Sequence, residues 1–331
     1  MLNRRSLLAG ALFAMLPLRL VHAQDKTTLS LGTATPGGGF PLYGAAFADT
    51  ANEADPSLLV QPRNTKGSTE NIPLIEAGML DLALVTGEPF YEAVNGIGRA
   101  PANLRIITAM YSTPGMFVAR GDSAYRSIAD LLGKPVAFGA KGSGLVILAR
   151  YVLDGLGYDM NKDFQAVYLD RAGDGPAMVE DGRVAALWGG GSGWPGFDAA
   201  AKSAAGARFI APDAAQVKRI VDKHALLKPM VIPARSYPGQ DAAIASVGSW
   251  AFVIARPTLA DDVAYKLVRA LHRSEAAIAK RLPQAIETTA ANTVAASARV
   301  DLIHPGVQRY LREAGLLPDN KAKAQAQSFP P

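Results

Sequence analysis

The chain has 331 residues, 49% of them hydrophobic, with 32 glycines, 22 prolines and no cysteine. A chain of this length and composition forms roughly two lobes with proper cores, which excludes a disordered or fibrous protein. The net charge of +5 is small, and no basic run has interleaved aromatic residues, so nucleic acid is not an expected partner. The lack of cysteine excludes a disulfide framework and a thiolate nucleophile.

Residues 1–23 have the pattern of an export signal that is removed from the mature protein. A basic start is followed by an apolar run over 6–18 and by Val-His-Ala at 21–23, which resembles a cleavage site. The arginine pair at 4–5 fits either a twin-arginine signal or an ordinary secretory signal. A membrane anchor is disfavoured because the run is shorter than the roughly 20 apolar residues that span a bilayer. Without this segment the chain has 31 basic and 29 acidic residues, and we expect a periplasmic protein cleaved near Ala23.

The first predicted elements are a strand at 27–33, a helix from Pro41 to about Ala54 and a strand at 58–61. Proline is typical of the first helical position, which places the start of this helix at Pro41. The run Pro-Gly-Gly-Gly at 36–39 lets the backbone turn sharply and approach a ligand closely.

The stretch 65–88, TKGSTENIPLIEAGMLDLALVTGE, begins with a turn and a short helix. Ser68 or the threonine after it is expected to cap this helix, since its hydroxyl accepts from the free N–H groups of the first turn. Pro73 is tolerated only near the first turn, so the regular part is predicted to begin near Asn71. The exposed N–H groups at such a helix end can hold an anion.

The same stretch ends with a glycine stop, a strand and a second loop. Gly78 is predicted to end the helix in the left-handed conformation, and Met79 to add to its apolar surface. Residues 82–85 predict a short strand buried on both faces, which is typical of a parallel sheet. We expect an open loop at 86–88.

The rest of the chain continues the alternation of strands and helices. Strand-like runs at 104–111 and 116–119 flank Ser-Thr-Pro-Gly at 112–115, which we interpret as a crossing between two lobes. Further strands are predicted at 135–138, 166–169, 184–188, 231–232 and 247–255, and helices at 128–132, 145–153, 174–180, 214–225, 260–274 and 303–313. Trp188, at a strand end, is expected in the core.

Two segments repeat one pattern and indicate two equivalent units. Residues 76–84 and 180–188 each have an acidic residue, a glycine two positions later and an apolar strand that ends at a glycine-bearing loop. With the glycine- and serine-rich turns before helices, this predicts two α/β lobes whose strand ends face a shared cleft. We expect 24–112 and 240–331 in lobe 1 and 113–239 in lobe 2.

The sequence shows no catalytic pattern. The histidines at 224, 272 and 304 are scattered, so no metal site is predicted. No serine lies in G-x-S-x-G, and no phosphate loop is present. The acids between Asp170 and Asp181 are interpreted as surface residues near turns, although an acid/base pair among them is the alternative. We therefore expect a binding protein without catalytic residues or cofactor.

Six motifs, in order, carry a resemblance to a known family. They are GGGFP at 37–41, TKGSTEN at 65–71, EAGMLDLALV at 76–85, GAKGSG at 139–144, YPGQD at 237–241 and IHPGVQRYLREAG at 303–315. Together they resemble the TAXI family of solute receptors that serve tripartite (TRAP) transporters. The resemblance implies a type II periplasmic binding protein fold, with two α/β lobes joined by hinge strands. Such a receptor closes on a small organic anion, a carboxylate or an amino acid such as glutamate, and delivers it to a membrane permease.

The resemblance also implies a set of ligand contacts around the cleft. The residues carried over by motif are Gly38, Gly39, Phe40, Thr65, Gly67, Ser68, Asn71, Thr86, Gly87, Glu88, Ser143 and Gly144. The chain departs from the family pattern in two places. Gly39-Phe40 replaces two adjacent aromatic residues, and Thr86-Gly87-Glu88 replaces Gln-x-Asp. Glutamate is therefore not assumed as the ligand.

Several side chains in or near this set have two interpretations. Ser68 and Ser143 either contact the ligand or cap helices, and Glu88 either meets an ammonium group or faces water. Trp194 is a candidate for stacking on a ligand. The basic residues beside the loops, any of which could neutralise a carboxylate, are Arg63, Lys66, Lys141 and Arg171.

Three other functions stay open from the sequence. A receptor for an ABC importer shares the two-lobe design. A secreted enzyme on the same fold would use the acids between Asp170 and Asp181. A ligand-sensing subunit of a membrane kinase would need a partner that the sequence does not identify.

Overall fold

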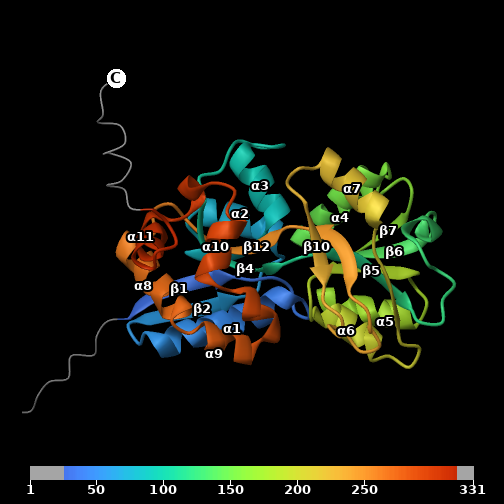
Figure 1. The fold of residues 1–331 in the computed structure, drawn as a ribbon, viewed down its shortest axis with the longest axis horizontal. Helices are drawn as coiled ribbons and strands as arrows, with labels where there is room; N and C mark the ends of the chain where they lie inside the picture. Colours follow the sequence, from blue (N-terminus) through green and yellow to red (C-terminus); the bar gives the residue numbers. More distant parts are fainter. Residues whose placement is uncertain (1–25, 319–331) are drawn as a thin grey trace, which may run out of the picture.

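Two five-stranded sheets, each with helices on both faces, form two lobes that lie side by side (Figure 1). The computed structural model describes residues 26–318. The predicted signal segment therefore lies outside the described residues. The predicted helices and strands all lie within them. Over 26–318, no helix is both long and apolar enough to cross a bilayer.

The sheet of lobe 1 has the strand order β2-β1-β3-β12-β4. Its strands are β1 (Thr27–Gly32), β2 (Leu58–Arg63), β3 (Leu82–Thr86), β4 (Arg105–Ser112) and β12 (Trp250–Ala255). The first three are parallel, and β12 is antiparallel to both of its neighbours.

The sheet of lobe 2 has the order β7-β6-β8-β5-β9. Its strands are β5 (Gly115–Arg120), β6 (Pro135–Ala140), β7 (Gln165–Leu169), β8 (Ala186–Gly190) and β9 (Ala207–Ile210). Here β7, β6 and β8 are parallel, and β5 is antiparallel to β8 and β9.

The two sheets therefore have the same plan, which confirms the predicted two-lobe fold. The strands of the repeated pattern, β3 and β8, hold the same third position in their sheets. Gly78 and Gly182, the two glycines of the pattern, are both left-handed, with φ of 69° and 79°. A left-handed residue lets a helix end sharply, so the chain can enter the next strand directly.

The chain crosses between the lobes at two adjacent places. The first crossing follows β4 at Thr113, as the sequence predicts. The second lies at Ser249, between β11 (Ile244–Gly248) and β12. The N–H and the hydroxyl of Thr113 both donate to the Ser249 carbonyl at 2.8 Å, so the two crossings run side by side as a hinge.

The second crossing corrects the expected boundary at 239–240. Strand β10 (Lys228–Ile232) pairs with β11 in an antiparallel ribbon. Ile232 and Val247 pack into the two apolar clusters of lobe 2, so the chain stays with that lobe up to Gly248. The single strand expected at 247–255 is therefore two strands, because its two halves belong to different lobes.

Seven helices cover the sheet of lobe 1, and four cover the sheet of lobe 2, in the part of the chain that the structure describes. The helices of lobe 1 are α1 (Gly39–Ala54), α2 (Ser68–Glu76), α3 (Gly87–Asn95), α8 (Asp261–His272), α9 (Glu275–Arg281), α10 (Ala290–Ala296) and α11 (Pro305–Glu313). Those of lobe 2 are α4 (Gly144–Leu156), α5 (Gly175–Glu180), α6 (Pro195–Ala201) and α7 (Ala214–Lys223).

Several of these helices differ from the predictions. Helix α1 begins two residues before Pro41. Helix α2 begins at Ser68, because the Gly67 carbonyl already accepts from the N–H groups of its first turn, and it contains Pro73. Met79 is 64% exposed and adds nothing to the core. Helices α3, α6 and α10 and strand β9 are not predicted at all, and the helix expected at 128–132 is a 3-10 turn.

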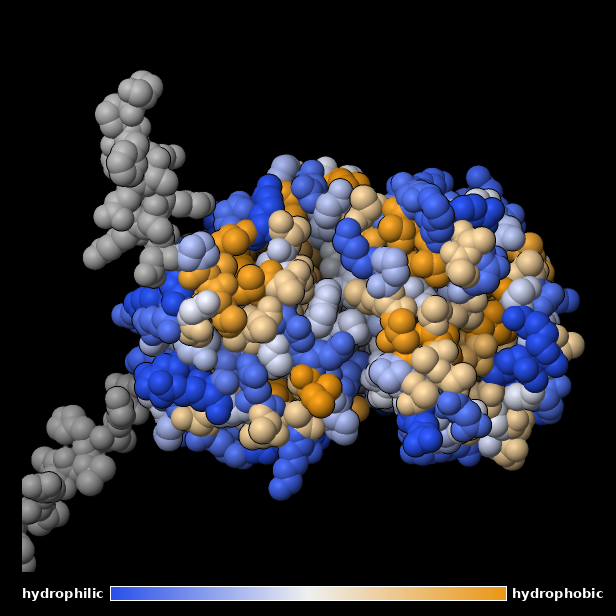
Figure 2. Space-filling model, viewed as in Figure 1, coloured by the Kyte–Doolittle hydropathy of each residue, from blue (hydrophilic) through white to orange (hydrophobic). Residues whose placement is uncertain are grey.

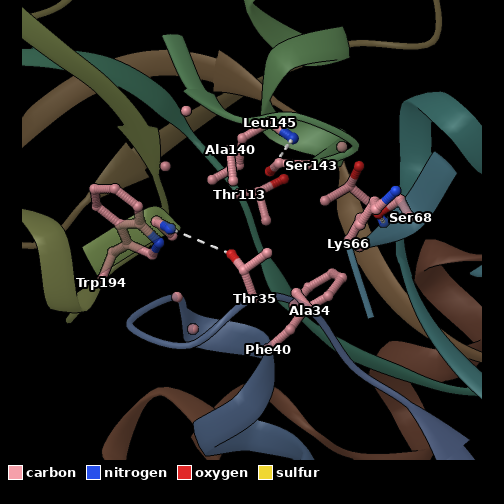
Figure 3. Close-up of a pocket in the computed structure, with 18 of the residues that line it drawn as sticks. Ala34, Thr35, Phe40, Lys66, Ser68, Thr113, Ala140, Ser143, Leu145 and Trp194 are labelled. Atoms are coloured by element: carbon pink, nitrogen blue, oxygen red, sulfur yellow. Dashed lines mark hydrogen bonds between the residues drawn. The ribbon is translucent and has the colours of Figure 1, made fainter. Parts of the chain in front are cut away.

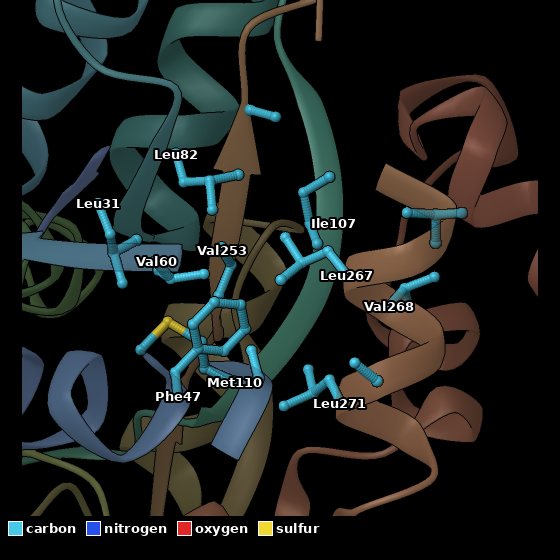
Figure 4. Packing of buried hydrophobic residues seen from close by; sticks show 14 of the residues in the cluster. Leu31, Phe47, Val60, Leu82, Ile107, Met110, Val253, Leu267, Val268 and Leu271 are labelled. Carbon is cyan, nitrogen blue, oxygen red and sulfur yellow. The ribbon is translucent and has the colours of Figure 1, made fainter. Parts of the chain in front are cut away.

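Alternating side chains along each strand belong to apolar clusters on opposite faces of the sheet. Along β3, Leu82 and Leu84 face α1 and α8, whereas Ala83 and Val85 face α2 and α3. Figure 4 shows the first cluster, with strand residues against Phe47 of α1 and Leu271 of α8. Burying each large side chain contributes about 1.5–3 kcal/mol, so these clusters hold the strand ends in place at the lobe boundary.

Candidate ligand-binding site

A small cavity of about 50 Å³ lies between the lobes, beside the two crossings. In the space-filling view the lobes are separated by a groove (Figure 2). The close-up shows side chains from both lobes around the cavity (Figure 3). Its lining comprises Ala34, Thr35, Gly38, Gly39, Phe40, Lys66, Gly67, Ser68, Thr86, Tyr111 and Thr113 from lobe 1 and the crossing, and Gly139, Ala140, Ser143, Gly144, Leu145, Leu169, Ala172, Gly190 and Trp194 from lobe 2.

The structure brings eight of the twelve predicted contacts to this cavity. They are Gly38, Gly39, Phe40, Gly67, Ser68, Thr86, Ser143 and Gly144. Thr65, Asn71, Gly87 and Glu88 do not line it. Trp194 and Lys66, considered from the sequence, do. Thr113 could have been found from its place in the predicted crossing, whereas Tyr111, Leu169 and Ala172 carry no sequence signal.

Four helices begin at the cavity wall. Helices α1, α2 and α4 start with the lining residues Gly39, Ser68 and Gly144, and Thr86 is the N-cap of α3. The first three or four N–H groups of a helix have no partner within it, and the helix dipole places partial positive charge there. In α1, α2 and α3 no side chain caps these groups. Such ends are suited to hold an anion.

The two serines of the site have different roles. Ser143 is a helix cap, because its Oγ accepts from the N–H of Leu145 at 3.2 Å. Ser68 is not a cap, contrary to the sequence prediction. Its buried Oγ accepts from the N–H of Thr86 at 3.1 Å and so joins the start of α2 to the end of β3. Gly67, in a conformation with φ of 113°, holds the N-cap position instead.

Asn71 lies behind the cavity wall and does not line the cavity, so a contact with the ligand stays a prediction of the sequence. Its Nδ2 donates to the carbonyls of Thr33 at 2.9 Å and Leu84 at 2.8 Å, and it is fully buried. Thr65 also bonds the Thr33 carbonyl, at 3.1 Å. These two side chains therefore hold the ends of β1 and β3 together below the site.

Gly87 and Glu88 belong to the first turn of α3 and not to an open loop. A Cβ on Gly87 would lie 2.5 Å from Ser249 Oγ, so this turn packs on the second crossing. Glu88 is fully buried, and neither carboxyl oxygen has a hydrogen-bond partner in the described residues. Burial raises the pKa of the Glu88 carboxyl to about 7, although the nearby hydroxyls of Ser249 and Thr86 act against this rise. Glu88 thus neither faces water nor reaches the cavity.

Few charges lie near the cavity. Lys66 is exposed at its edge. Arg63, Lys141 and Arg171 are exposed and do not line it, and Lys141 pairs with Asp170 at 3.6 Å. Among residues 26–318, no group of three or more His, Cys, Asp or Glu side chains is placed to hold a metal ion.

Comparison with known proteins places the chain in a family. The sequence model of the NMT1-like family matches residues 31–315. The chain belongs to the NMT1-like family, a family of periplasmic solute-binding proteins.

Solved structures support the fold of this NMT1-like protein. A protein from Bordetella bronchiseptica RB50 matches with a TM-score of 0.56 and 12% identity, over 88% of this chain and 99% of that one. The periplasmic binding protein BugD matches with a TM-score of 0.55 and 14% identity, over 87% and 98% of the two chains. At such identities the likeness concerns the fold alone, which is the two-lobe type II fold that the sequence predicts.

The lobes of the NMT1-like protein touch on two sides of the cavity. On one side the N–H of Thr69 donates to the Gly142 carbonyl at 3.1 Å. On the other side the N–H of Ala172 donates to Thr35 Oγ1 at 3.2 Å (Figure 3), and a Cβ on Gly37 would lie 2.5 Å from Gly173 Cα. These contacts join the backbone of one lobe to the backbone or a short side chain of the other. The two lobes are therefore in a closed arrangement.

Proposed function

We propose that this NMT1-like protein is a periplasmic receptor that captures a small organic anion by closing its lobes, without catalysing a reaction. The observation that carries the proposal is the set of helix N-termini that meet at one cavity on the lobe boundary. Three of them lack a side-chain cap, and N–H groups at such helix ends can bind a carboxylate. In α2 one of these groups, that of Thr69, already donates to the Gly142 carbonyl.

The energetics allow binding without a buried basic side chain. Four charge-assisted hydrogen bonds at roughly 1.5–3 kcal/mol each give about 6–12 kcal/mol. The helix dipoles add roughly 0.3–1 kcal/mol each. Against an association cost of about 4–15 kcal/mol, the balance reaches the roughly −8 kcal/mol of micromolar affinity when apolar contacts help.

We infer from the six motifs of the TAXI pattern that the receptor serves a TRAP-type permease. An ABC importer is the alternative, because the two-lobe fold is common to both receptor classes. Uptake by proteoliposomes that contain the cognate permease separates the two. Uptake driven by an ion gradient in the absence of ATP supports the TRAP assignment, and a strict ATP requirement contradicts it.

A secreted enzyme is less well supported. Asp170, Asp174, Glu180 and Asp181 are all exposed, and none lines the cavity. Asp181 instead pairs with Arg183 on the surface at 2.7 Å. Export through residues 1–23, by either signal type, and a role as a sensing subunit both remain predictions of the sequence.

The first expected result is saturable binding of small carboxylates. The mature protein is unfolded, dialysed and refolded to remove any co-purified ligand, then titrated with a panel of carboxylates and amino acids. Ligand at 100 times its Kd stabilises the folded state by about 2.7 kcal/mol and raises Tm. Sodium chloride at the same ionic strength serves as the control. Absence of binding across the carboxylates contradicts the proposal.

A second expected result concerns a latch between the lobes. The carboxylate of Glu92, on α3, pairs with Arg150 and accepts from the hydroxyl of Tyr151 at 2.9 Å, both on α4. Partly exposed ion pairs contribute about 0.2–1 kcal/mol, so Glu92→Ala is expected to raise Kd by up to about five-fold. Calorimetry with the tightest carboxylate of the panel measures this.

The matched control for the latch is Glu76→Ala. Glu76 pairs with Arg99, and both residues belong to lobe 1, so its loss does not affect contact between the lobes. An equal change of Kd in the Glu92 and Glu76 variants argues against a latch.

A further inference from the structure

The cavity contains no negative charge. Of its twenty lining residues none is aspartate or glutamate. Tyr111, which also lines it, stays neutral because burial raises the pKa of its phenol far above the usual value. Glu88, near the lining residue Thr86, is not among the lining residues. A ligand ammonium group would therefore be buried here without a counter-charge, which disfavours its binding.

The lining combines polar and apolar side chains. Figure 3 places Lys66 and Ser68 on one side and Trp194 on the opposite side. Trp194 is 6% exposed and packs edge-on against Phe197, so its ring is part of the core of lobe 2. Leu145 and Leu169 add apolar surface from the same lobe. The lining thus offers apolar surface to an uncharged tail close to the helix starts that can bind a carboxylate.

The cavity is also small. Its volume of about 50 Å³ is well below the roughly 150 Å³ of an apolar cavity that holds benzene. Each further carbon of a ligand therefore requires the lobes to stay further apart. Separation would break the contacts of Thr69 with Gly142 and of Ala172 with Thr35, so the cost rises with ligand length.

We propose that the ligand is an aliphatic monocarboxylate of about two to four carbons, with neither an amino group nor a second carboxylate. This inference rests on the proposed function and narrows it. The carboxylate binds at the uncapped starts of α1 and α2, and the short tail lies against the apolar part of the lining, which includes Phe40, Leu145 and Trp194. Alanine and glutamate are poor ligands because the lining has no acidic side chain to pair with their ammonium group, and dicarboxylates because Lys66 is the one charged side chain in the lining.

Three matched ligands test the proposal on the unmodified protein. Propionate, alanine and succinate share one carboxylate and differ by an added ammonium group or a second carboxylate. By calorimetry on the ligand-free protein, propionate is expected to bind at least about ten-fold more tightly than either of the others. Hexanoate is expected to bind at least about ten-fold more weakly than propionate.

The outcomes distinguish a failure of this inference from a failure of the proposed receptor function. If alanine, glutamate or succinate binds as tightly as propionate, the inference is overturned and the receptor function stands. Equal affinities of hexanoate and propionate likewise overturn the size limit. If no carboxylate of the wider panel binds, the receptor function fails, and the inference fails with it.

Discussion

Replacing Gly144 with alanine is expected to weaken ligand binding by about 10- to 100-fold while both lobes stay folded. A Cβ at this position would lie 2.0 Å from Thr86 Oγ1, 2.7 Å from Ser68 Oγ and 3.0 Å from Thr86 Cβ. Gly144 begins α4 in lobe 2, whereas Thr86 and Ser68 belong to lobe 1, so the clash exists only when the lobes are closed.

The clash cannot be relieved by rotating a side chain alone. Thr86 Cβ is attached to the backbone, and Ser68 Oγ is held by the N–H of Thr86. Overpacking of this kind costs about 1–3 kcal/mol, and each 1.4 kcal/mol is a factor of ten in Kd. Calorimetry with the tightest carboxylate measures the loss, and thermal unfolding without ligand checks that the lobes are intact.

Gly38→Ala is the matched control for this prediction. Gly38 also lies at a helix start in the cavity wall, but the nearest atom to an added Cβ, Ala172 Cβ, is 3.5 Å away. Its φ of −91° suits alanine, so Kd is expected to stay within about three-fold of the original. Unchanged binding by the Gly144 variant would mean that the ligand is held in a different, more open arrangement.

Glu88→Gln is expected to remove a large pH dependence of stability. Because burial raises the pKa of Glu88 from 4.5 to about 7, its folded-state carboxyl stays protonated where the unfolded one is ionised. The folded state then binds more protons, so stability is greatest below pH 4.5 and falls as the pH rises towards 7. At 1.36 kcal/mol per pKa unit, the loss is about 3 kcal/mol.

Urea unfolding of both proteins between pH 4 and pH 8 measures this effect. The variant is expected to gain stability relative to the original chain steadily from pH 4.5 to pH 7 and to keep that gain above it. Glu180→Gln, at an exposed glutamate, is the control and should show no such change. A difference between Glu88→Gln and the original chain that is constant with pH contradicts the prediction.

The fold could be predicted from the sequence because its signals are local. Each of these signals extends over about ten residues or fewer. They are the periods of the strands and helices, the glycine stops at Gly78 and Gly182 and the crossing at Thr113. Helix α3 was not predicted because Gly87 and Pro89, at its start, are typical of a loop. The break at Ser249 was not predicted because residues 247–255 are apolar apart from Gly248 and Ser249, whichever lobe each part enters.

The sequence by itself determined two α/β lobes, glycine-rich helix starts and the absence of a catalytic pattern. Only the tertiary structure decided which of those residues line the cavity between the lobes. Asn71 and Glu88 resemble site residues because they follow the turns at the starts of α2 and α3. In the structure both side chains are buried, Asn71 against Leu84 and Glu88 near Ser249. Trp194 and Thr35, far apart in the chain, line one cavity because the lobes close. Such contacts depend on how the lobes pack, which no local pattern encodes.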